Sequence, residues 1–160
     1  MKLYSSDMIN LYQNKKKKGL KISLYSLIII VPLFVVFLIM VKLKTRVLFT
    51  ILSTIDLSIY SVIFIYNLLE NIIKSNDLIK HINHVLNGNP KEVYGNIVSI
   101  SNVITLKRNI HIVEVEIKSE NETNKAYFNL DLFDIGFKVD DKISALISNN
   151  FITEYEVKND

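Results

Sequence analysis

Two long apolar stretches dominate the first half of the chain. They cover residues 22–41 and 47–69, carry no charged side chain except Asp56, and are separated by the residues KLKTR. As α-helices of 20 and 23 residues they would rise about 30 and 35 Å, which matches a hydrocarbon core of roughly 30 Å. The first stretch is too long for a cleaved signal peptide and lacks a small-residue cleavage site. The pattern therefore predicts a multi-pass integral membrane protein with a hairpin of two transmembrane helices.

The helical pattern of the second stretch continues beyond its end. No glycine or proline occurs between residues 70 and 87, so we expect the helix to extend as an amphipathic stalk that stops at the NGNP of residues 87–90. The predicted contact face of the stalk has helical spacing and consists of Ile72, Ile79, Ile82 and Leu86. This apolar face either lies against the domain that follows or forms a short parallel coiled coil.

From residue 91 onward, apolar and polar residues alternate as in half-buried β-strands. In HIVEVEI, for example, Val113, Val115 and Ile117 point to one face and the charged residues to the other. The Asn149-Asn150 pair fits a two-residue hairpin turn because asparagine tolerates positive φ angles. Five strands are expected, at residues 93–100, 111–118, 125–132, 142–148 and 151–157. Their number and length predict a small five-stranded antiparallel β-barrel of OB or SH3 type.

These patterns divide the chain into four segments and predict an α+β membrane protein. Residues 1–21 form a basic amino-terminal segment, residues 22–69 the transmembrane hairpin, residues 70–90 the stalk helix, and residues 91–160 the soluble β-barrel domain. Within the first segment, residues 1–14 are expected to form either a short interfacial helix or a disordered tail.

The two halves of the chain differ in charge. Residues 1–46 carry nine Lys and Arg against a single acidic residue, whereas residues 70–160 carry ten against fourteen Asp and Glu. Basic residues beside a span mark the cytoplasmic side and attract anionic headgroups. We therefore expect a plasma-membrane protein with both termini in the cytoplasm, membrane lipids as partners and, given the acidic second half, no bound nucleic acid. The main basic cluster consists of Lys15, Lys16, Lys17, Lys18 and Lys21.

A single acidic residue, Asp56, interrupts the second apolar stretch. A carboxylate near the middle of a span costs roughly 2.5 to 3.5 kcal/mol on insertion scales, so such a residue is usually functional. Three interpretations remain open: contact with another copy or a partner membrane protein, an ion or proton path, and a protonated aspartate bonded within its own helix pair. The polar stripe on this helix face consists of Ser53, Asp56, Tyr60 and Asn67.

Catalytic and metal-binding motifs are absent from the sequence. The chain has no cysteine, no glycine-rich phosphate loop and no nucleophile elbow. His81 and His84 are spaced like metal ligands on a helix, but no third ligand lies near them in the sequence. We therefore expect no enzyme activity, no cofactor, no metal site and no small-molecule substrate.

The layout of two membrane helices followed by a five-stranded barrel resembles that of the short NfeD-type bacterial membrane proteins. The glycine-rich strand openings of that family are missing, since the strands and turns of the tail contain only Gly95 and Gly136. No functional residue is therefore transferred to this chain. The resemblance implies a scaffold or partner-docking role at the membrane rather than chemistry.

Together these observations predict a non-enzymatic, membrane-anchored interaction or accessory protein. In this interpretation the hairpin docks to its own copies, as a homo-oligomer, or to a larger membrane complex, and the barrel presents a binding surface. The alternative is a small transport or channel component, or an immunity-type protector against a membrane-active toxin.

Overall fold

The computed structural model describes residues 1–41, 46–106, 110–120 and 122–158. It divides the chain into two compact units. The helical unit is Leu11–Asn76, and the β unit combines Met1–Asn10 with Asp77–Asp160. The sequence predicts a separate basic segment at the amino terminus, whereas the structure places the first ten residues in the β unit.

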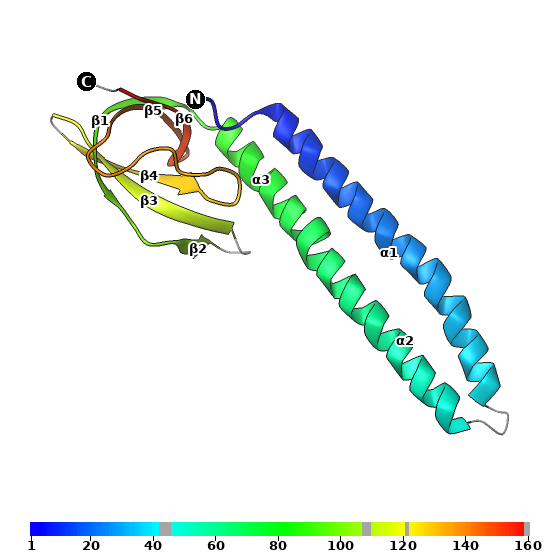
Figure 1. The fold of residues 1–160 in the computed structure, drawn as a ribbon. Coiled ribbons are helices and arrows are strands. Elements are labelled where there is room, and N and C mark those ends of the chain that lie inside the picture. Colours follow the sequence, from blue (N-terminus) through cyan, green and yellow to red (C-terminus); the bar gives the residue numbers. More distant parts are fainter. Residues whose placement is uncertain (42–45, 107–109, 121, 159–160) are drawn as a thin grey trace. The chain divides into compact units, whose positions relative to one another are not determined.

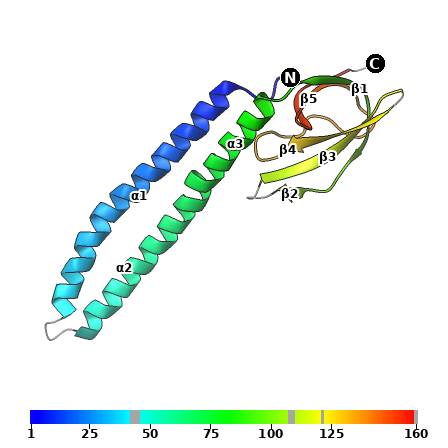
Figure 2. The ribbon, with the colours of Figure 1, turned by 180° about the vertical axis from the view of Figure 1, so that it is seen from behind.

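Two long helices supply the helical unit, where they run side by side (Figures 1 and 2). The first is α1, Ser6–Val41. The second consists of α2, Arg46–Asn67, the π-helical segment η1, Leu68–Ile73, and α3, Lys74–Leu86. These three segments form one continuous helix of 41 residues, and both long helices are long and apolar enough to cross a membrane. Residues 42–45 of the predicted KLKTR connection lie outside the described residues.

Within the described residues of the β unit, six strands form one mixed sheet. They are β1 (Lys91–Ile100), β2 (Ile104–Leu106), β3 (Ile110–Lys118), β4 (Thr123–Asn129), β5 (Lys142–Ser148) and β6 (Phe151–Val157). Their order is β1-β5-β6-β4-β3-β2, and β1 also pairs with β3, so five of the strands form a closed cycle of neighbours. The pairing of β4 with β6, at Tyr127 and Phe151, is parallel, and the other pairings described are antiparallel.

The sheet confirms the predicted α+β class and several local predictions. β5 and β6 have the predicted bounds, and Asn149 and Asn150 between them have φ angles of 49° and 67°, as the hairpin turn requires. The prediction of five antiparallel strands is wrong in two respects. It omits β2, whose three residues are too few to show an alternating pattern. It also overlooks that a closed cycle of five strands cannot be antiparallel throughout, because an odd cycle needs at least one parallel pair.

The core of the β unit lies between the strands and α3. Val115 and Phe128 from the sheet and Ile82 and Val85 from α3 are fully buried. The hydroxyl of Ser148, at the end of β5, donates a 2.6 Å hydrogen bond to the carbonyl of Val85, which also accepts a 3.3 Å bond from the Gly88 amide just after α3. Residues 77–86 of the stalk therefore pack on the domain that follows them.

The face of α3 that is buried differs from the predicted one. Ile82 is buried as predicted, but Leu86 is 40% exposed, and Leu78 and Val85 are buried instead. The adjacent apolar pairs 78–79 and 85–86 flank Ile82 on both sides, so helical spacing alone allows either choice. Ile79 is only half-buried, and Ile72 lies in the helical unit, where it packs beside Gly19 of α1.

Residues 1–4, here called the strap, form an additional extended segment on the edge of β6. Lys2 pairs antiparallel with Glu154, the Leu3 amide donates to the Thr153 carbonyl at 2.8 Å, and the Tyr155 amide donates to the Met1 carbonyl at 3.0 Å. The side chains of Leu3 and Tyr4 are buried, at 4% and 2% exposure. Leu3 and Tyr4 therefore belong neither to an interfacial helix nor to a disordered tail, the two alternatives predicted for residues 1–14.

Candidate functional site: the polar seam of the helical hairpin

The polar stripe predicted on the second apolar stretch faces α1. Ser53 and Asn67 are buried at 6% and 3% exposure, and Asp56 and Tyr60 are half-buried, while most of their apolar neighbours on α2 are exposed. We call this contact line between α1 and α2 the polar seam. An aromatic contact extends the polar seam toward the residues that connect the two helices. It joins Phe37 of α1 to Phe49 of α2, whose ring centroids are 6.3 Å apart.

Asn67 is the centre of a hydrogen-bond network in this seam. Its Nδ2 donates to the Gly19 carbonyl and to the Ser23 hydroxyl, both at 2.7 Å, and its Oδ1 accepts a 2.7 Å bond from Nδ2 of Asn71. Both amide protons and the carbonyl of the side chain are thus satisfied within the hairpin. The π-helical segment begins at the next residue, and such segments are frequent at functional sites.

Gly19 permits this network and was not among the predicted site residues. A Cβ at position 19 would lie 2.8 Å from the Cβ of Asn71 and 3.3 Å from Oδ1 of Asn67, so a side chain would force the two helices apart. The sequence does contain a signal for it, a single glycine within a long helical pattern, where glycine costs about 1 kcal/mol relative to alanine. Such a cost is typical of a position where two backbones approach closely.

Asp56 lies in the same seam but lacks the partners that Asn67 has. Its Oδ2 atom is buried and has no hydrogen-bond partner among the described residues. The neighbouring seam hydroxyl, that of Ser53, donates to the carbonyl of Thr50 at 3.0 Å. The nearest cation along α2 is Arg46, ten residues away, which corresponds to about 15 Å of helix. Among its described residues, the hairpin therefore holds a carboxylate without placing a complementary charge beside it.

The basic cluster lies next to the polar seam on α1. Lys15, Lys17, Lys18 and Lys21 are exposed, whereas the ammonium of Lys16 donates a 2.8 Å hydrogen bond to Oδ1 of Asn76.

Two exposed tyrosines, one on each helix, lie close to the Asn67 network in the sequence. Tyr25 of α1 and Tyr66 of α2 are 61% and 66% exposed and neighbour the Ser23 to Asn67 contact in sequence. Exposed tyrosines beside a lysine cluster are typical of a membrane–water interface.

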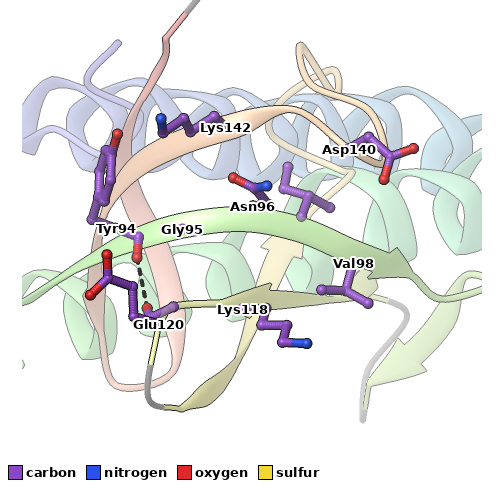
Figure 3. A pocket seen from close by; sticks show the side chains of 10 residues that line it. Tyr94, Gly95, Asn96, Val98, Lys118, Glu120, Asp140 and Lys142 are labelled. Carbon is purple, nitrogen blue, oxygen red and sulfur yellow. Dashed lines mark hydrogen bonds between the residues drawn. The ribbon is translucent and has the colours of Figure 1, made fainter.

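In the β unit, a shallow groove of about 670 Å³ follows β1. Figure 3 shows Lys118 and Lys142 on opposite sides of the strand, with Glu120 and Asp140 toward opposite ends. The ammonium of Lys142 lies 5.8 Å from the ring centroid of Tyr94, within cation–π range. The lining thus offers both signs of charge and an aromatic ring, which suits polar contacts with another protein.

His81 is a half-buried residue of the β unit. Its Nε2 lies 3.2 Å from the Tyr4 hydroxyl, and its ring meets that of Phe151 edge to face at 4.5 Å. Burial, assisted by the nearby His84, lowers the pKa of His81 to about 4, so the ring is neutral and its Nε2 can accept a hydrogen bond from the Tyr4 hydroxyl. Burial likewise raises the pKa of Tyr4, and a hydrogen bond with Asn129 opposes this only in part. Within the described residues, no three acidic or histidine side chains are grouped to hold a metal.

In comparisons with known proteins, the chain matches no family model, no curated protein and no solved structure.

Proposed function

We propose that this chain is a non-enzymatic, membrane-anchored interaction protein of the plasma membrane. One observation carries the proposal: the helical unit exposes its apolar side chains and buries polar ones. Ile29 and Val62 are each 68% exposed, while Ser53 and Asn67 are buried. That distribution is unfavourable in water and favourable in hydrocarbon, where exposed apolar groups cost nothing and polar groups need internal partners.

In this proposal the β unit is an OB-type barrel that presents a protein-binding surface. The closed cycle of five strands and the single parallel pair support the barrel. Close approach of β1 to β3 at Gly95, where any Cβ would overlap the Lys118 carbonyl, supports tight closure. The mixed-charge groove along β1 is the surface that we assign to partner contact.

Both termini are proposed to lie in the cytoplasm. The strap and the carboxyl-terminal strands belong to the same unit, so they occupy the same side of the membrane. The basic cluster, with Lys74 and Lys80 on the other helix, gives this side more cations than the hairpin loop. Burial of Leu3 and Tyr4 in the β unit also supports an uncleaved first helix, because cleavage after it would remove both residues from the core.

Alkaline extraction of the full chain tests the anchoring, and labelling of single introduced cysteines tests the topology. Because the native chain has no cysteine, each label reports a single site. We expect the protein to stay with the membrane at high pH, and cysteines at Asn89 and Asn10 to react only with reagent on the cytoplasmic side. A chain that is monodisperse in water without detergent would exclude the proposal.

Asp56 supports a second candidate, a small transport or channel component. Its partnerless carboxylate oxygen within the seam is the kind of group that ion and proton paths use. Flux measurements on vesicles containing the protein separate the two functions. A pH-dependent flux that disappears in Asp56→Asn would favour transport, whereas the absence of flux with intact membrane anchoring favours the interaction protein.

A further inference from the structure

Within the two apolar stretches, neither the hairpin itself nor a further copy of this chain offers Asp56 a complementary charge. Residues 22–41 and 47–69 contain no other charged residue, so a second copy would bring another acid to this depth and no base. The hydroxyls of Thr54, Ser58 and Ser61 on α2 are also committed, since each donates to a backbone carbonyl of its own helix at 2.8 to 2.9 Å. Homo-oligomerisation therefore leaves the carboxylate uncompensated.

We infer that Asp56 is the docking point for a lysine or arginine on the membrane helix of a different protein. This inference rests on the proposed membrane anchoring and names the partner's chemistry. An acid in hydrocarbon is costly when isolated, and pairing with a base is the usual solution. Charge complementarity thus selects a basic partner helix over a second copy.

The position of Asp56 at the edge of the seam allows a third helix to reach it. The residue is half-buried rather than enclosed, so part of its side chain remains exposed at the edge of the polar seam. Three apolar residues on the same side of α2 are available for packing: Leu52, Ile59 and Ile63, which are 37%, 57% and 47% exposed. A helix packed on this side of α2 would cover these side chains and bring its central base to the carboxylate.

Designed probe helices test the inference directly. The full chain, labelled at Asn89→Cys, is reconstituted in phosphatidylcholine vesicles with a synthetic Leu/Ala helix that carries one central lysine, and association is measured by energy transfer. The matched probe has leucine at the same position. We expect the lysine probe to associate on the order of tenfold more tightly than the leucine probe, in line with polar contacts between membrane helices.

Three variants complete the test. Asp56→Asn removes the charge and should reduce association of the lysine probe to the level of the leucine probe. Asp56→Glu should restore the preference for the lysine probe. Thr54→Asn introduces a polar group about 200° around the helix from Asp56 and should leave the preference unchanged. Equal binding of the two probes to the native chain, or an undiminished preference in Asp56→Asn, would overturn the inference.

The proposed function is measured separately in the same vesicles. Flotation reports membrane anchoring whatever the probe result is, and loss of anchoring in the native chain would count against the proposed function itself. Removing a charge from the span eases insertion, so Asp56→Asn is expected to remain folded, which circular dichroism verifies.

Discussion

The two units of this protein distribute polarity in opposite ways. The β unit buries residues such as Phe128 completely and leaves charges on its surface, as expected for a domain in water. The helical unit exposes Ile29 and Val62 and encloses Ser53 and Asn67. Hydrophobic burial therefore stabilises the first unit, whereas in the proposed membrane environment close packing and internal hydrogen bonds stabilise the second. The same kind of substitution should consequently have different effects in the two units.

The largest expected effect is the truncation of an aromatic core residue in the β unit. Phe128 has no exposed surface and packs edge to face with Phe137, with ring centroids 5.3 Å apart. Phe128→Ala should lower the free energy of unfolding of the β unit by about 4 kcal/mol, as for other large-to-small core substitutions. Urea titration followed by near-ultraviolet circular dichroism measures the change. In the helical unit Ile29→Ala should have no comparable effect, and equal losses would refute the contrast.

A charge on an exposed apolar position gives the second largest effect, this time in the helical unit. Ile55 is 50% exposed near the middle of α2, and Val103 is 57% exposed in the β unit. Ile55→Arg should oppose membrane insertion by about 3 kcal/mol, because the side chain would face hydrocarbon. Val103→Arg should change stability by no more than about 0.5 kcal/mol, because it faces water. The membrane-inserted fraction and the unfolding free energy are the two measurements, and a harmless Ile55→Arg would contradict membrane anchoring.

Substitutions in the Asn67 network should have intermediate effects. Asn67→Leu removes three hydrogen bonds, at about 0.6 kcal/mol each between membrane helices, so helix pairing should weaken by about 2 kcal/mol. Gly19→Ala should cost a similar amount, roughly 1 to 3 kcal/mol, through overpacking. The rate of disulfide formation between cysteines at Phe37 and Phe49 reports the pairing. Leu20→Ala, on the exposed side of α1, is the control and should leave that rate unchanged.

The features that sequence could predict are those with a local period. The alternation of apolar and polar residues predicted both ends of β5 and of β6 correctly, and the Asn149-Asn150 pair predicted the hairpin turn between them. Both signals depend only on neighbouring residues. The orientation of the polar stripe also had a local signal, but the residues opposite it did not. Contact of Gly19 with Asn67 joins positions 48 apart, and no periodic pattern specifies such a pair.

The strap illustrates the same limit in the β unit. Residues 1–4 show no strand pattern of their own, and their partner strand lies about 150 residues away, at the other end of the chain. Tyr4 is buried against His81 of α3 and Phe133 in the segment after β4, an environment that exists only in the assembled unit. Only the three-dimensional arrangement therefore reveals that the amino terminus completes the β unit.

The last contrast is a pH dependence that belongs to the β unit and comes from His81. Its pKa is about 4 in the folded state, below its ordinary value of 6.5, because the ring is buried against Tyr4 and Phe151. Between these two pH values the unfolded chain binds a proton that the folded chain does not, so stability should fall as the pH falls from 6.5 to 4 and should then level off.

The titration of carboxylates sets the lower limit of the pH range in which the effect of His81 can be measured. Hydrogen bonds from neighbouring side chains, including Lys125 to Glu116 and Asn124 to Glu122, lower the pKa of both glutamates below 4.5, so their contribution is lost only at more acidic pH. The slope between pH 6.5 and 5 therefore isolates the histidine. Urea titrations across this window should show a decline in the native protein that His81→Gln abolishes and the exposed-site variant His84→Gln largely retains. An identical slope in native protein and His81→Gln would show that the ring is not held neutral by the strap and core, and would remove the pH contrast between the two units.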